Sequence, residues 1–122
     1  MTPAARIAAA IDLVAAIDAA PTRPADAVAN DFFRARRYIG SSDRRAVSER
    51  TWRVLRGRRR LDWWLRAALP TPRLLTAASL LLDGWALPGL REAFSGGRFA
   101  PAALDPAEMA VLQTIAGHTW AQ

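Results

Sequence analysis

Arginine is the residue type whose spacing in this sequence most suggests chemistry. Eleven of the seventeen basic residues lie between Arg34 and Arg60, against only two acids, Asp43 and Glu49. The whole chain has a formal net charge of +6, so this window supplies all of the positive excess. A basic excess confined to one stretch of a folded chain indicates a polyanionic partner, most often nucleic acid.

Residues suited to catalysis or metal binding are scarce. Cysteine is absent, and His118 is the only histidine. There is no nucleophile elbow, no phosphate-cradling glycine loop and no metal-ligand spacing. The sequence therefore predicts no catalytic residue, no metal site and no cofactor site within these 122 residues.

Helix signals recur along the chain and must position the arginines. Thr2-Pro3 and Thr71-Pro72 each combine a hydroxyl N-cap with proline at the first helical position. Asp105, Pro106 and Glu108 form a capping-box pattern. No segment alternates like a strand, so we expect an all-α bundle of about five to seven helices.

The apolar periodicity gives approximate bounds for these helices. We expect Gly40 to end the second helix in the left-handed conformation and Ser41 or Ser42 to cap the third. The expected helices cover residues 3–20, 24–39, 72–83, a short stretch near 90–94, and 106–116. The third helix begins at about residue 42, and we expect Gly57 to weaken or bend it before residues 61–65.

Membrane and export signals are missing. The longest apolar stretch, 74–82, is about half the length needed to cross a bilayer. Asp12 and Asp18 lie where a signal peptide would be apolar. We expect a cytoplasmic protein with no membrane contact.

A helical wheel separates the arginines of the third helix. Arg45, Arg53 and Arg56 fall opposite the apolar stripe that contains Val47. The basic turn after Gly57 and the end of the second helix add further candidates. The predicted RNA-binding set is Arg45, Arg53, Arg56, Arg58, Arg59, Arg60, Arg36 and Arg37. The alternative is a solvated, arginine-rich surface from a GC-rich genome.

Arg44 differs because the wheel places it within the apolar stripe. A guanidinium there needs a carboxylate, since an unpaired buried charge is costly. We therefore expect Arg44 to be structural and paired with an acid of the first two helices, with Asp31 as the candidate. Asp43, directly before it, is assigned a structural role as well.

The tryptophans have two interpretations. Trp52 lies at the edge of the polar face, where it could stack a base or pack against a neighbouring helix. Trp63 and Trp64 cannot both face one core, so we expect one of them near the surface.

Residues 43–65, DRRAVSERTWRVLRGRRRLDWWL, resemble the signature of the NusB-like helical domain. They are most similar to the version at the N-terminus of RsmB-type ribosomal RNA cytosine-5 methyltransferases. The resemblance extends over about residues 1–70 and implies an all-α bundle that binds RNA. In such enzymes the chemistry lies in a following Rossmann-like domain that binds S-adenosylmethionine and uses cysteines.

No methyltransferase residue can be carried over, because cysteine and a Gly-rich strand–turn–helix are absent. We expect residues 1–122 to be one RNA-binding domain whose parent is a ribosomal RNA methyltransferase, which leaves open whether the protein is an enzyme. The alternative is a NusB-like protein-interaction or antitermination module. A third possibility is a scaffold that packs on its own catalytic domain through Trp63 and Trp64.

Overall fold

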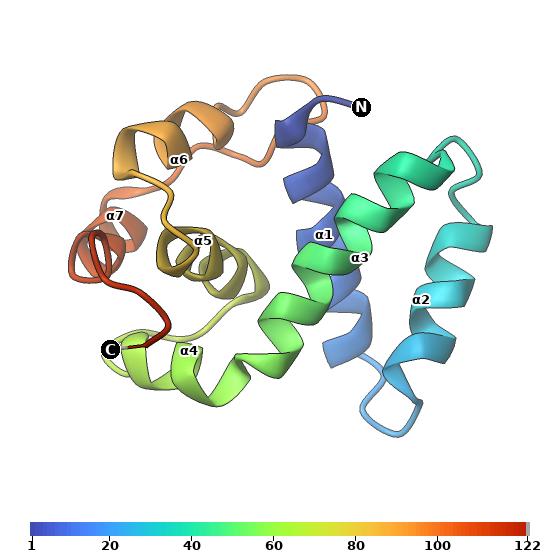
Figure 1. Cartoon of the computed structure of the whole chain (residues 1–122), viewed down its shortest axis with the longest axis horizontal. Coiled ribbons are helices and arrows are strands. Elements are labelled where there is room, and N and C mark those ends of the chain that lie inside the picture. The colour runs from blue at the N-terminus through green and yellow to red at the C-terminus, as the bar shows by residue number, and fades with distance from the viewer. Residues whose placement is uncertain (122) are drawn as a thin grey trace.

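The computed structural model describes residues 1–121, which form seven α-helices and no strand. The all-α prediction is confirmed. In chain order the helices are α1 (Pro3–Asp18), α2 (Ala25–Arg34), α3 (Ser41–Arg56), α4 (Arg58–Trp64), α5 (Pro72–Leu82), α6 (Leu87–Ala93) and α7 (Pro106–Gln113) (Figure 1).

Local caps fix where three of these helices begin. The hydroxyls of Thr2 and Thr71 each accept a hydrogen bond from the backbone amide three residues later. Asp105 accepts from the amide of Glu108 at 2.7 Å, and the Glu108 carboxylate accepts from the amide of Asp105 at 3.0 Å. Each bond satisfies a backbone donor that the first helical turn leaves unpaired, so the sequence signals were sufficient here.

The link between α2 and α3 differs from the prediction. α2 ends at Arg34, and Ile39, only 2% exposed, turns into the core instead of extending the helix. Gly40 does not adopt the predicted left-handed conformation. Its φ is −72° and it is the N-cap of α3, in place of a serine side chain. Burial of Ile39 therefore shortens α2 and shapes the turn that carries Arg37.

Helix α5 is the centre of the larger core. Every residue from Leu74 to Leu82 is buried. In Figure 1 α5 is seen nearly end-on with α1, α3, α4, α6 and α7 around it, and α2 lies beyond α1 and α3. Burial on all sides explains why this helix is apolar nearly all round, with Thr76 and Ser79 as its buried polar residues.

A second core cluster lies between α1, α2 and α3. It includes Leu13 from α1, Phe32 and Phe33 from α2, Ile39 from the turn and Val47 from α3. α3 also packs on α5, so it lies between the two clusters and connects them. α2 packs mainly on α1, and two cavities remain between α2 and α3.

Among residues 1–121, none of the helices has both the length and the apolar character required to cross a membrane.

Candidate nucleic-acid interface

The arginines of the basic segment divide according to whether an internal partner holds them. The first group meets at Asp83, which follows α5. Its carboxylate accepts from Arg50 at 2.7 Å, from Arg53 at 3.1 Å and from the Trp120 indole at 2.5 Å. Burial alone would raise the pKa of Asp83, but donation from Trp120, Arg50 and Arg53 outweighs it and holds the pKa below its ordinary value. Asp83 therefore joins α3, α5 and the C-terminal segment.

Glycine at position 57, between α3 and α4, leaves the space that Trp120 needs to reach this cluster. A Cβ at this position would lie 2.4 Å from a ring carbon of Trp120. The guanidinium of Arg53 covers that indole at 4.6 Å from its centroid. Glycine thus allows Trp120 to pack directly on the turn, and Arg53 is engaged by both a carboxylate and a ring.

Two more arginines of the predicted RNA-binding set make internal contacts. Arg58 pairs with Asp18 at 3.2 Å and with Asp62 at 3.4 Å. Arg36 donates to the backbone oxygen of Phe32 at 3.2 Å and lies 3.7 Å from the centroid of its ring. These contacts take up part of the donor capacity of both guanidiniums and fix their positions.

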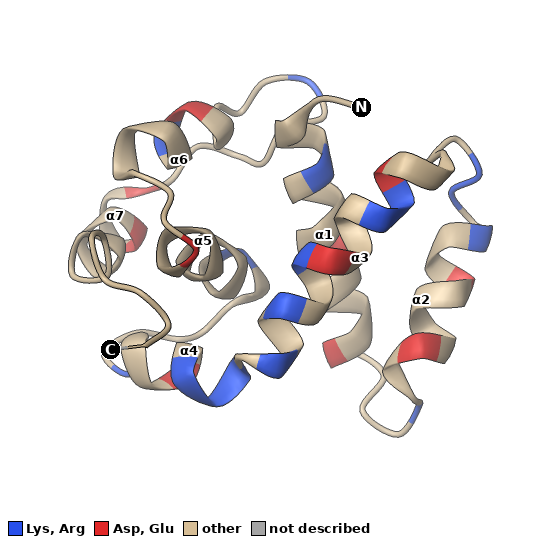
Figure 2. Cartoon of the chain, in the orientation of Figure 1, with Lys and Arg blue, Asp and Glu red and all other residues tan. Residues whose placement is uncertain are grey.

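The remaining members of the set, Arg37, Arg45, Arg56, Arg59 and Arg60, are exposed. Within residues 1–121, no carboxylate lies at ion-pair distance from any of them. Figure 2 shows basic positions along α3 and at the start of α4. Their donors face solvent and are available to an external anion.

Four of these side chains lie on α3 and the start of α4. Arg45 and Arg56 are eleven residues apart, about three helical turns, and therefore project from the same side of α3. Arg59 and Arg60 follow in the first turn of α4, after the turn at Gly57. Glu49, also exposed, is the one acid within α3 on this side. We call these four arginines the α3–α4 row.

The predicted pair between Arg44 and Asp31 is wrong. Asp31 instead pairs with Arg23 at 2.8 Å and Arg34 at 3.4 Å. Arg44 is exposed, and its guanidinium lies 5.3 Å from the centroid of the Phe33 ring. The wheel placed Arg44 within the apolar stripe, whereas the side chain is exposed at the edge of α2, where the Phe33 ring accepts the cation without a carboxylate.

Asp43 connects the start of α3 to α1. Its carboxylate accepts from Arg6 at 2.8 Å and from the Met1 amino group at 3.3 Å. The hydrogen bond from Arg6 is the main reason that the pKa of Asp43 lies below its ordinary value. This contact holds the N-terminal end of α3, which carries Arg44 and Arg45, against α1.

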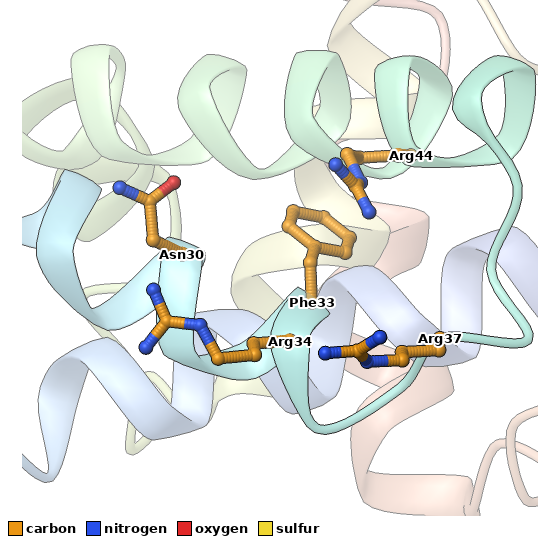
Figure 3. A pocket seen from close by; sticks show the side chains of 5 residues that line it. All are labelled: Asn30, Phe33, Arg34, Arg37 and Arg44. Carbon is orange, nitrogen blue, oxygen red and sulfur yellow. The ribbon is translucent and has the colours of Figure 1, made fainter.

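Two neighbouring cavities lie between α2 and α3. The first, of about 430 Å³, is lined by Asn30, Phe33, Arg34, Arg37 and Arg44 (Figure 3). The second, of about 380 Å³, shares Asn30, Phe33 and Arg44 with the first and extends along α3 to Trp52 and Arg56. Because they share three lining residues, we treat them as one α2–α3 groove. Sequence reasoning missed Arg34 and Asn30, although the short link between two neighbouring helices hinted that the end of α2 faces the start of α3.

The tryptophans of α4 separate as predicted. Trp63 is 53% exposed and lies beneath the Arg66 guanidinium, 4.2 Å from the ring centroid. Trp64 packs on the larger core cluster and meets Trp63 edge-on at 5.0 Å. Trp52 is partly buried against the second cluster, so it packs against neighbouring helices, and it also lines the groove, where stacking of a base stays a prediction.

Metal ligands do not gather in the part of the chain described. Across residues 1–121 no group of three or more His, Cys, Asp or Glu side chains could hold a metal ion. The His118 ring lies 4.8 Å from the Trp64 ring. The chemistry of this surface is therefore that of arginine, asparagine and aromatic side chains.

Comparison of the chain with protein-family models, with curated proteins and with solved structures found no match. The exposed arginines and the α2–α3 groove are therefore the features of this chain that indicate its function.

Proposed function

We propose that this chain is an RNA-binding domain that holds the phosphates of single-stranded RNA with the α3–α4 row. One observation carries the proposal: four arginines of the row are exposed and have no carboxylate partner among residues 1–121, although the same segment holds several paired arginines. Each contact between such a guanidinium and a phosphate releases condensed counterions, which drives binding.

The sequence resemblance indicates which kind of RNA the chain binds. Residues 43–65 resemble a NusB-like domain, and the row lies within that segment. On this basis the RNA is ribosomal, and the chain is the N-terminal part of an S-adenosylmethionine-dependent ribosomal RNA cytosine-5 methyltransferase. Its role is to position RNA for a catalytic domain outside these residues.

The mechanism is electrostatic positioning. A row of guanidiniums attracts the RNA backbone at long range and then forms short, charge-assisted hydrogen bonds with phosphate oxygens. Phosphate contacts fix the position and orientation of a nucleic acid without reading its sequence. The four groups need no large rearrangement, because α3 and α4 pack on the larger core.

Charge reversal tests the proposal. In the variant Arg45→Glu/Arg56→Glu, we expect the affinity for a single-stranded ribosomal RNA fragment to fall roughly tenfold or more at ~0.1 M salt. Arg91→Glu/Arg98→Glu is the matched control, because both residues are exposed and lie outside the basic segment. Fluorescence anisotropy would measure both. Equal loss in the two variants would mean that only net charge matters, and the row would have no role.

A protein partner is the second candidate. Trp63, 53% exposed on α4, favours it, because large exposed aromatic side chains are enriched at protein interfaces. The partner would be an acidic protein surface or a catalytic domain of the same protein. Unchanged RNA binding after reversal of Arg45 and Arg56 would favour this function. In that case Trp63→Phe should remove most of the tryptophan fluorescence that iodide quenches in the isolated chain.

A further inference from the structure

The first cavity of the α2–α3 groove is surrounded by arginines from three parts of the chain. Arg34 is the last residue of α2, Arg37 lies in the turn, and Arg44 belongs to the first turn of α3. In Figure 3, Arg44 descends from α3 over Phe33, Arg37 extends from the turn below it, and Arg34 extends the other way, toward the side of Asn30. All three arginines line the first cavity.

No acid lines the first cavity, although Asp26 and Glu49 line the neighbouring second one. Within residues 1–121, Asp31 is the one carboxylate bonded to any of these three arginines, and it is shared between Arg34 and Arg23. Within residues 1–121, neither Arg37 nor Arg44 has an ion pair. Gathering like charges without a counter-charge is unfavourable, so the arrangement favours binding of an external anion.

Three contacts organise the site before an anion arrives. Arg44 lies over Phe33, which is only 6% exposed and packed in the second core cluster. Arg34 is bonded to Asp31. The turn that carries Arg37 is anchored by the buried side chain of Ile39. Arg44, held over a buried ring, therefore loses less conformational entropy on binding a phosphate than a free side chain would, whereas the guanidinium of Arg37 has no ion-pair partner within residues 1–121 and is positioned only through its turn.

The groove is larger than one phosphate and continues toward an aromatic residue. The second cavity shares Asn30, Phe33 and Arg44 with the first and adds Trp52 and Arg56, together with two acids, Asp26 and Glu49. An indole on a groove wall can stack a base, and the amide of Asn30 can donate to or accept from one. The groove therefore offers a phosphate position and a base position side by side.

We propose that the α2–α3 groove binds one nucleotide of single-stranded RNA. Its phosphate lies among Arg34, Arg37 and Arg44, and its base lies against Trp52. The RNA occupant rests on the proposed function; the phosphate position does not. RNA is favoured over a phosphopeptide because the groove leads to Arg56, a member of the α3–α4 row, and only a polymer of phosphates would engage both. The phosphate is either an internal phosphodiester or a 5′-terminal monoester.

The main test is the variant Arg37→Gln/Arg44→Gln, with Arg91→Gln/Arg98→Gln as its matched control. Each is titrated with one RNA oligonucleotide carrying either a 5′-phosphate or a 5′-hydroxyl, at several salt concentrations. We expect roughly a tenfold loss of affinity in the first variant and little in the control. Loss with both oligonucleotides identifies an internal phosphodiester, and loss with the phosphorylated one alone identifies a terminal phosphate.

The salt dependence shows how many phosphates the site holds. If Arg37 and Arg44 clamp one phosphate, the log–log slope should decrease in magnitude by about 0.7 in the double variant. A decrease of about 1.4 would mean that each arginine holds its own phosphate, which would overturn the clamp.

A second measurement does not require RNA. In an NMR titration with inorganic phosphate, the Nε–Hε signals of Arg37 and Arg44, assigned with the single glutamine variants, should change their chemical shifts and reach a plateau. The signal of Arg91 should not follow the same curve. Arg37→Gln lies in an exposed turn, so its melting temperature should equal that of the wild type and show that the fold is intact.

The outcomes separate this proposal from the proposed function. If RNA binding is lost on reversal of Arg45 and Arg56 but not in Arg37→Gln/Arg44→Gln, the groove proposal fails and the proposed function stands. If the wild type binds inorganic phosphate or a phosphopeptide through Arg37 and Arg44 but binds no RNA, the RNA occupant is overturned together with the proposed function.

Substitution of Trp52 tests the base position. Trp52→Phe keeps a ring and should bind RNA within about threefold of the wild type, whereas Trp52→Ala should lose roughly tenfold. Both are measured well below their melting temperatures, because Trp52 also packs on the second core cluster. If folded Trp52→Ala binds RNA as tightly as the wild type, the base position is wrong.

Discussion

Two aspartates, each bonded to two arginines, serve different purposes in this molecule. The carboxylate of Asp83 is 24% exposed and also accepts from the Trp120 indole. The carboxylate of Asp31 is 50% exposed and pairs only with arginines near the surface. The first pair of arginines is held within the packing of α3 on α5. Of the second pair, Arg34 lies at the edge of the α2–α3 groove, whose other arginines have no carboxylate partner within residues 1–121.

The contrast shows that the number of arginines in a segment of sequence differs from the number that remain available to bind a ligand. On the side of α3 that faces α5, Arg50 and Arg53 neutralise a carboxylate and hold the fold together. On the sides that face α2 and solvent, Arg44, Arg45 and Arg56 have no such partner within residues 1–121. We infer that the unpaired group binds the ligand.

Removal of the two carboxylates gives the largest expected difference. Asp83→Asn leaves two guanidiniums and an indole without their charged acceptor, and should lower the free energy of unfolding by about 2–3 kcal/mol. Asp31→Asn, which also loses two ion pairs, should cost less than about 1 kcal/mol, because solvent screens exposed pairs. Urea denaturation of both variants would measure the difference.

The pH dependence of stability provides a check on the same carboxylate. Because the pKa of Asp83 is lower in the folded than in the unfolded chain, its stabilisation is present above about pH 4 and lost as pH falls further. Asp83→Asn should therefore lose less stability than the wild type between about pH 5 and pH 2. Parallel profiles for the two proteins would contradict the role given to Asp83.

Two glycine substitutions probe the contact between the α3–α4 turn and Trp120. Gly57→Ala places a Cβ 2.4 Å from the indole and should destabilise the fold by about 1–3 kcal/mol through displacement of Trp120. Gly89→Ala is the control: this glycine lies in α6 with no atom within 4 Å of an added Cβ, and alanine should stabilise by about 0.5–1 kcal/mol. If the melting temperatures of Gly57→Ala and Gly89→Ala change in the same direction, the proposed contact between the turn and Trp120 is contradicted.

Local signals were enough to predict much of the fold. The caps at Thr2, Thr71 and Asp105 act within three residues of sequence, and an apolar stretch such as 74–82 identifies a central helix without tertiary information. The turn before α3 was misjudged because burial of Ile39, a tertiary effect, decides where α2 ends.

The site could be predicted only in outline. The wheel gave the exposure of Arg45 and Arg56 correctly. It could not show that Arg53, three residues before Arg56, bonds to Asp83, because that partner is thirty residues away. The same limit hid the ring of Phe33 beneath Arg44. A helical wheel gives the direction of a side chain, whereas its partner depends on packing between helices.

The smallest expected effect concerns the acid within the α3–α4 row. Glu49 is exposed on the side of α3 that carries Arg45 and Arg56, and it should repel RNA phosphates. Glu49→Gln should raise the affinity for RNA about two- to threefold at ~0.1 M salt, since exposed charges interact weakly. Glu92→Gln, on α6, is the control and should bind as the wild type does. Equal gains in both would reflect net charge alone.

The most direct test of the account measures the salt dependence of RNA affinity for a paired and an unpaired arginine of α3. For the wild type we expect a log–log slope near −3, since four arginines of the row contact phosphates. Arg56→Gln should reduce its magnitude by about 0.7, and Arg53→Gln should leave it unchanged while lowering stability. Equal reductions in the two variants, or a flat salt dependence in the wild type, would contradict the account.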